Sequence, residues 1–127
     1  MSYVLVVDDD DDIRDLIGRK LRSRGHTVDG AADGVSGLDK ALTTAPDLVL
    51  LDWMMPGMDG LEVCRALRAT EQGSQTIVIL LTAKAQEVDV QRGLAAGADD
   101  YVVKPFSPNG LADRIDEALG HRPAASR

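Results

Sequence analysis

The sequence is poor in the residues that build disulfides and nitrogen- or sulfur-ligated metal centres: it has one cysteine, Cys64, and two histidines, His26 and His121. A single cysteine excludes an intrachain disulfide and fits a reducing compartment. No apolar run approaches the roughly 18–20 residues that a membrane span needs, and no basic segment precedes the first apolar residues, as a signal peptide requires. These absences predict a cytoplasmic protein, with Cys64 as a packing residue and both histidines at the surface.

Positive charge is scarce as well, because 14 basic residues face 21 acidic ones, for a net charge of −7. Such a surface repels phosphate backbones, so we expect no direct nucleic-acid binding by this domain. Five of the acids are consecutive, Asp8 to Asp12, and directly follow the apolar run 4–7. A run of like charge is usually a solvated stretch, but this one begins where a buried strand should end.

Apolar runs of strand length alternate with longer stretches of helical period. We expect strands at residues 3–8, 27–30, 48–52, 76–82 and 101–104; the third and fourth are continuous apolar runs, which is typical of strands buried on both faces. Five successive βα units predict an α/β fold, a doubly wound five-stranded parallel sheet flanked by five helices. We expect residues 1–120 to form one domain and residues 121–127 to be a disordered C-terminal tail.

Helix-end signals support these boundaries. Asp59, followed three residues later by Glu62, resembles a capping box, and Asp10 is placed to cap the first helix. Gly25 and Gly97 follow the first and fourth helices, where a residue in the left-handed conformation commonly closes a helix. The helices are therefore expected to end where the apolar periodicity ends.

Polar side chains end four of the predicted strands: Asp8 and Asp9, Asp52, Thr82 and Lys104. The carboxyl ends of parallel strands share one edge of the sheet, where ligands of open α/β sheets bind, so these side chains should converge. Carboxylates ~4 Å apart repel by roughly 4 kcal/mol per pair at an effective dielectric near 20, so either some of them are protonated or a cation lies among them. All-oxygen ligands favour Mg²⁺. With an ammonium and a hydroxyl beside the metal, the set predicts a phosphoryl-transfer site with Asp52 as nucleophile.

Four motifs in this order resemble the receiver domains of two-component response regulators, over about residues 3–120. They are Val6-Val7-Asp8-Asp9, the run from Leu51-Asp52 to Asp59-Gly60, Leu81-Thr82-Ala83, and the run from Gly97-Ala98-Asp99-Asp100 to Lys104-Pro105-Phe106. The resemblance implies a flavodoxin-like fold with strand order 2-1-3-4-5. It also implies a phosphorylation-dependent switch in a two-component system.

The resemblance further implies a role for each site residue. Asp52 accepts a phosphoryl group from a sensor histidine kinase or a phosphotransfer protein, and the domain catalyses only its own phosphorylation and dephosphorylation. Asp9, Asp52 and the backbone carbonyl of Met54 ligate Mg²⁺, and Asp8 supports the metal through water. Lys104 contacts the phosphoryl oxygens.

The switch and the phosphoryl lifetime are likewise assigned by resemblance. Thr82 moves to bind the phosphoryl group, and Tyr101 changes rotamer with it and alters the face formed by the fourth helix, fifth strand and fifth helix, which controls an unknown downstream protein. Met54 and Lys84 occupy the positions that tune the phosphoryl lifetime, and Pro105 follows a cis peptide bond. The apolar Met54 side chain cannot position an attacking water, which predicts slow self-dephosphorylation.

Simpler interpretations exist for single residues. Asp8 and Asp9 taken alone fit a helix cap followed by a solvated acidic turn. Thr82 alone is an ordinary strand-end hydroxyl, and Tyr101 alone is an ordinary half-buried packing residue. Trp53 directly follows Asp52, and we expect it near the mouth of the site.

Two other functions are weighed against the switch. A Mg²⁺-dependent phosphatase would also use an aspartate nucleophile at a strand end, but such enzymes usually carry a general acid two residues later, where this chain has Met54. A degenerate receiver used only as a binding module would not need the complete polar set.

The sequence does not specify what the receiver controls, a separate protein or a domain of the same chain. We favour a stand-alone receiver over a module of a longer regulator with a DNA-binding or enzymatic output domain. Receivers that dimerise upstream of DNA-binding domains typically carry an arginine and a glutamate where this chain has Val90 and Ala95. A phosphorylation-dependent dimer remains an alternative.

Overall fold

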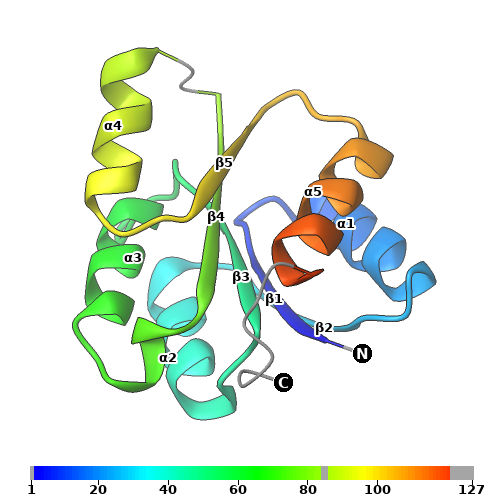
Figure 1. The fold of residues 1–127 in the computed structure, drawn as a ribbon, viewed down its shortest axis with the longest axis horizontal. Coiled ribbons are helices and arrows are strands. Elements are labelled where there is room, and N and C mark those ends of the chain that lie inside the picture. The colour runs from blue at the N-terminus through cyan, green and yellow to red at the C-terminus, as the bar shows by residue number, and fades with distance from the viewer. Residues whose placement is uncertain (1, 84–85, 121–127) are drawn as a thin grey trace.

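The computed structural model describes residues 2–83 and 86–120. Five parallel strands form one sheet in the order β2-β1-β3-β4-β5, which confirms the predicted fold (Figure 1). The strands are β1 (Tyr3–Val7), β2 (Thr27–Ala31), β3 (Leu48–Asp52), β4 (Ile77–Thr82) and β5 (Asp100–Val103). They alternate with α1 (Asp11–Ser23), α2 (Gly34–Thr44), α3 (Gly60–Arg68), the short 3₁₀ helix η1 (Gln72–Ser74), α4 (Glu87–Ala95) and α5 (Pro108–Gly120).

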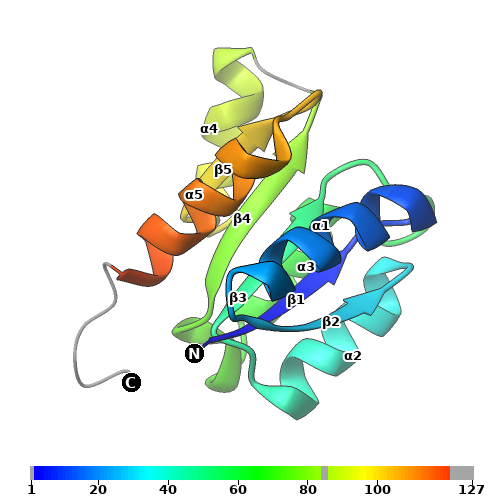
Figure 2. The same cartoon turned by 90° about the vertical axis from the view of Figure 1, so that its right-hand side faces the viewer.

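The sheet divides the interior into two apolar cores. Helices α1 and α5 cover one face of the sheet, and α2, α3 and α4 lie on the other (Figure 1 and Figure 2). Alternate residues of β3 serve the two sides: Leu48 and Leu50 pack with α1 and α5, whereas Val49 and Leu51 pack against α2 and α3. This two-sided burial explains why the central strands are continuous apolar runs rather than alternating ones.

The predicted strand bounds differ from the observed ones by at most one residue. Asp8 lies just beyond β1 and Lys104 just beyond β5. Both residues nevertheless continue the ladder, because the Asp8 amide donates to Ala31 O at 3.1 Å and the Lys104 amide donates to Thr82 O at 2.8 Å. Their side chains are therefore held by backbone hydrogen bonds at the edge where the strands finish.

The helix-end predictions are confirmed. The Asp10 side chain caps α1 by accepting hydrogen bonds from the Asp12 and Ile13 amides, and Asp59 and Glu62 form a complete capping box at α3. Gly25 and Gly97 adopt φ values of 90° and 106°, in the region that glycine enters at little cost. Among the described residues, no helix is long and apolar enough to cross a membrane.

One prediction about a histidine is wrong. His26 is not a free surface residue, because its Nε2 lies 2.5 Å from the Asp116 carboxylate of α5 and its side chain is only 10% exposed. Arg24 reaches the same carboxylate at 2.9 Å, and Asp113 at 2.7 Å. These contacts join the end of α1 to α5. His121 lies outside the described residues.

Candidate functional site

Parallel register brings the predicted residues to one edge of the sheet. Val7 pairs with Leu51, which sets Asp8 next to Asp52 on the neighbouring strand, and the pairing of Thr82 with Val103 sets Lys104 beyond Thr82. Asp8, Asp52 and Thr82 are buried, with exposures of 1%, 4% and 1%. Polar side chains are rarely buried without a partner or a function, so their burial marks this edge as the site.

The three carboxylates form a cluster suited to a hard cation. Asp8, Asp9 and Asp52 each offer a carboxylate oxygen, and these oxygens lie within 4.8 Å of one another. The Asp10 amide donates to Asp8 Oδ1 at 2.9 Å, which orients that carboxylate. Asp9 is exposed, so the cluster is open to solvent on one side. An oxygen-only set of this spacing fits an ion that takes one or two carboxylates and completes its shell with water.

Lys104 lies between the two buried acids. Its Nζ is 3.2 Å from Asp52 Oδ1 and 3.5 Å from Asp8 Oδ2. Burial alone would lower the pKa of Lys104, but the negative charges of Asp8 and Asp52 outweigh it and raise that pKa. The ammonium therefore stays charged beside the carboxylate that is the proposed nucleophile.

The Asp52 carboxyl has an unusual acidity. Burial, reinforced by the negative charge of Asp8, raises the pKa of Asp52 to about 6, and the Lys104 ammonium opposes this rise only in part. A neighbouring cation would favour the ionised form and reverse the shift. The site is thus electrostatically unfavourable without a metal, and this is the condition under which a divalent ion binds best.

This acidity predicts a pH-dependent stability difference between the wild type and Asp52→Asn in metal-free buffer. Because the folded-state pKa of Asp52 lies above its ordinary value of 3.8, the folded protein binds more protons than the unfolded chain between about pH 4 and pH 6. The contribution of Asp52 to the free energy of unfolding therefore decreases as the pH rises from about 4 to about 6. Asp52→Asn should be more stable by on the order of 1–2 kcal/mol at pH 7.5, after allowance for solvent screening, and equal to wild type near pH 4. Urea unfolding at both pH values measures this, and a constant difference contradicts it.

Thr82 and Tyr101 share a hollow beneath α4. Both line it, together with Trp53, Gly93 and Leu94. Thr82 is buried at the end of β4, whereas Tyr101 is partly exposed and packs against the core on the side of α2 and α3. A movement of either side chain would therefore change the packing against α4.

The position predicted for Trp53 is wrong. Its side chain is only 3% exposed and belongs to the core on the α2–α3 side, not to the mouth of the site. The Arg92 guanidinium lies 5.8 Å from the ring centroid, within the range of a cation–π contact. Trp53, the residue directly after Asp52, therefore contacts α4 through Arg92.

Of the two positions predicted to tune the phosphoryl lifetime, Met54 and Lys84, the structure describes only the first. The Met54 side chain, two residues after Asp52, is 59% exposed. Lys84 lies outside the described residues. The peptide bond between Lys104 and Pro105 is cis.

Two residues that shape the site were not identified from the sequence. The Arg14 guanidinium donates to the backbone oxygen of Asp8 at 2.8 Å, and nothing in the sequence spacing of this helical arginine indicates this. Gly60 begins α3 against the chain that follows Asp52: its amide donates to Trp53 O at 2.9 Å, and a Cβ there would lie 2.6 Å from Asp52 O. Its signal was the glycine directly after a capping aspartate.

Sequence comparison matches residues 4–116 to the model of the response regulator receiver domain. The chain belongs to this family. Receiver domains are signalling modules rather than classical enzymes, and they interact with histidine kinases and downstream effectors. The receiver domain of this chain is 46% identical, over 116 residues, to the DNA-binding response regulator MtrA of Mycobacterium tuberculosis, covering 91% of this chain and 50% of MtrA. It therefore spans about half the length of such curated relatives, which fits a module of a longer regulator as well as a stand-alone receiver.

Solved structures of receiver proteins share this fold, and one of them holds a metal ion in its active-site cleft. The chemotaxis protein CheY4 of Vibrio cholerae superposes with a TM-score of 0.88 at 36% identity, covering 92% of this chain and 98% of CheY4. The receiver domain of the sensor histidine kinase PA1611 from Pseudomonas aeruginosa superposes with a TM-score of 0.85 at 34% identity, covering 94% and 98%. That structure has a magnesium ion coordinated in its active-site cleft.

Proposed function

We propose that this receiver domain is switched by phosphorylation of Asp52, in a Mg²⁺-dependent reaction with a histidine kinase or a phosphotransfer protein. The observation that carries the proposal is the position of Lys104, whose Nζ lies 3.2 Å from the Asp52 carboxylate beside a cluster of three acids. A buried nucleophile, a fixed cation and a metal-binding carboxylate set are the components that phosphoryl transfer needs.

The residues have distinct parts in this reaction. Asp9, Asp52 and the Met54 carbonyl would hold Mg²⁺, with Asp8 acting through water, and the bound ion would neutralise the charge that otherwise repels a phosphoryl group. One oxygen of the ionised Asp52 carboxylate attacks phosphorus, the bond from phosphorus to the donor nitrogen breaks, and the donor imidazole keeps the electron pair. Lys104 holds the transferred oxygens, and the Thr82 hydroxyl donates a hydrogen bond to one of them.

The added charge of the phosphoryl group would change the surface that binds the downstream partner. A phosphoryl group brings about −1.5 to −2 charges to a buried site, and Thr82 moves toward it within the hollow that Tyr101 also lines. The change is passed to the face formed by α4, β5 and α5. A shift from 1:99 to 99:1 in favour of the active form requires about 5.5 kcal/mol, which new charge-assisted hydrogen bonds from Thr82 and Lys104 would supply.

The test is phosphorylation by a small donor. Incubation with acetyl phosphate and Mg²⁺, followed by intact-mass measurement, should give a single phosphoryl adduct in the wild type. No adduct should form with Asp52→Asn or in excess chelator. An adduct of equal yield on Asp52→Asn would overturn the proposal.

The lifetime of the phosphorylated form depends on Met54. We expect Met54→Asn to shorten this lifetime several-fold, because an amide at this exposed position can orient a water for attack on phosphorus, whereas the thioether cannot. The decay of the adduct after removal of the donor measures the effect, and Met54→Leu serves as the apolar control. Equal decay rates for Asn and Leu would contradict this role.

A second candidate is that residues 1–120 are the receiver module of a longer transcriptional regulator. The twofold greater length of relatives such as MtrA favours it. DNA contact would then belong to a following domain, since this one carries a net charge of −7. The aspartate-nucleophile phosphatase is not favoured, because Met54 stands where its general acid would be.

A further inference from the structure

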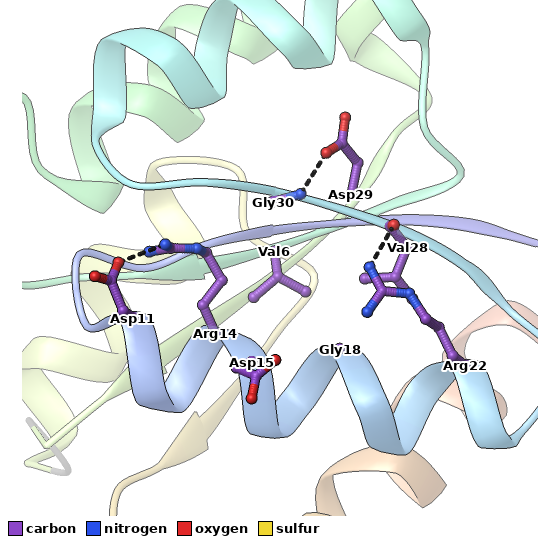
Figure 3. Close-up of a pocket in the computed structure, with 9 residues that line it drawn as sticks. All are labelled: Val6, Asp11, Arg14, Asp15, Gly18, Arg22, Val28, Asp29 and Gly30. Atoms are coloured by element: carbon purple, nitrogen blue, oxygen red, sulfur yellow. Dashed lines mark hydrogen bonds and ion pairs between the residues drawn. The ribbon is translucent and has the colours of Figure 1, made fainter.

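An open cavity of about 330 Å³ lies between α1 and the edge strand β2, separate from the phosphorylation site. Figure 3 shows Arg14 and Arg22 rising from α1 to β2 at the two ends of this cavity, with Gly18 between them on the helix and Val6 behind. This volume falls in the lower part of the range found for small-molecule sites. The function proposed above makes no use of it.

Glycine shapes both walls of the cavity. Gly18 is in the middle of α1, and Gly30 is the fourth of the five residues of β2; glycine is unfavourable within a helix or a strand. A Cβ on Gly18 would lie 3.2 Å from Arg22 Nη1, and a Cβ on Gly30 would lie 3.0 Å from Arg14 Cδ. The missing side chains therefore leave room for both arginines to lie across the cavity.

The charges around the cavity leave one cation without an acidic partner. Each acid on its rim is already paired: Asp11 with Arg14 at 2.5 Å, Asp15 with Arg19 at 2.5 Å, and Asp29 with Lys40 at 3.3 Å. Arg22 donates from Nη2 to the Val28 carbonyl at 3.1 Å, and within residues 2–83 and 86–120 no carboxylate lies within 4.0 Å of it. A guanidinium has five N–H donors, so most of those of Arg22 remain available.

From this arrangement we infer that the cavity between α1 and β2 is a binding site for a small monocarboxylate, held by the Arg22 guanidinium. A planar guanidinium matches a carboxylate through two parallel hydrogen bonds. One unpaired cation balances one negative charge, so a phosphate group with its charge near −2 fits the site less well. Val6 and Val28 provide an apolar wall for a short aliphatic group.

The same chemistry has two sources: a free short-chain acid, or an acidic side chain of a partner protein. The site recognises the carboxylate in either case. A free acid of a few atoms is expected to bind with a dissociation constant of about 1–10 mM. A carboxylate carried on a peptide gains further contacts and binds more tightly.

The test follows the backbone amide signals of Gly18 and Gly30 by NMR during titration with sodium butyrate at constant ionic strength. Saturable shifts at both glycines are expected with butyrate, and none with butyramide, its neutral equivalent. Arg22→Gln should weaken binding at least about tenfold. Lys20→Gln is the matched control, because it removes one positive charge from α1 at a residue that does not line the cavity, and it should change binding less than about twofold.

The outcomes separate clearly. Shifts that do not saturate, equal shifts with butyramide, or unchanged affinity in Arg22→Gln would overturn the inference. Should Arg22→Gln fail to fold, the butyrate and butyramide comparison on the wild type still decides. A capped single-glutamate peptide that binds at least tenfold more tightly than butyrate assigns the site to a protein carboxylate, and weaker peptide binding assigns it to a free acid.

Discussion

Replacing Asp9 with alanine should weaken Mg²⁺ binding at least tenfold while leaving the metal-free protein as stable as the wild type or more so. Asp9 is the exposed member of the three-acid cluster, whereas Asp8 and Asp52 are buried. Its carboxylate adds attraction for the ion when metal is bound and only repulsion when it is not. In the role proposed for Asp9, that of a direct ligand, its loss should cost at least the tenfold that is typical when a residue that merely supports a ligand is replaced.

Isothermal titration with Mg²⁺ measures this affinity, and urea unfolding in chelator measures the stability of the metal-free form. Asp12→Ala is the matched control, since it removes the same charge from the same acidic run at an exposed position outside the cluster. Its Mg²⁺ affinity should stay within about twofold of wild type, because exposed charges are screened by solvent and salt. Equal losses in the two variants would show that Mg²⁺ responds to net charge and not to a ligand at Asp9.

Gly60→Ala should destabilise the protein by about 3 kcal/mol or more. The added Cβ would lie 2.6 Å from the carbonyl oxygen of Asp52 and 2.9 Å from Trp53 Cα. Both contacts are with backbone atoms, which cannot relieve the overlap by changing rotamer as a side chain can. Either α3 or the chain after Asp52 must therefore move. The hydrogen bond from the Gly60 amide to Trp53 O is strained by the same displacement.

Urea unfolding at pH 7.5 measures the loss, and Gly110→Ala in α5 provides the comparison. A Cβ at Gly110 meets only the Ser107 side chain, at 3.5 Å, which is ordinary contact. Because alanine is the better helix former, Gly110→Ala should raise the free energy of unfolding by up to about 1 kcal/mol. A Gly60→Ala protein as stable as wild type would mean that α3 does not press on the Asp52 segment in solution.

The fold could be predicted because its determinants are local. Continuous apolar runs, helical periodicity and capping residues such as Asp59 each depend on a few neighbouring positions. The site edge could also be predicted, since parallel topology alone brings Asp52 and Lys104 together. The magnesium ligands and the switch roles came from the family resemblance, and for them the structure supplies geometry alone.

The features that could not be predicted depend on distant segments. His26 contacts Asp116 across 90 positions of sequence, and no spacing rule connects a turn after the first helix to a residue of the last helix. The burial of Trp53 requires α4 to pack over it. Arg14 reaches the Asp8 carbonyl only because of how α1 lies along the sheet. These contacts are set by side-chain direction and helix placement, which a pattern of polar and apolar letters does not encode.

The arginine and lysine that reach β2 have a further consequence for how copies of this protein meet. In the described part of the chain, β2 is the outermost strand beside β1 and has no strand on its other side, and an exposed strand edge is a template for pairing with another molecule. Here the Val28 carbonyl accepts a hydrogen bond from Arg22 at 3.1 Å, and the Gly30 carbonyl accepts one from Lys40 at 2.6 Å. Charged side chains thus occupy the acceptors that an incoming strand would need, so this margin of the sheet resists aggregation.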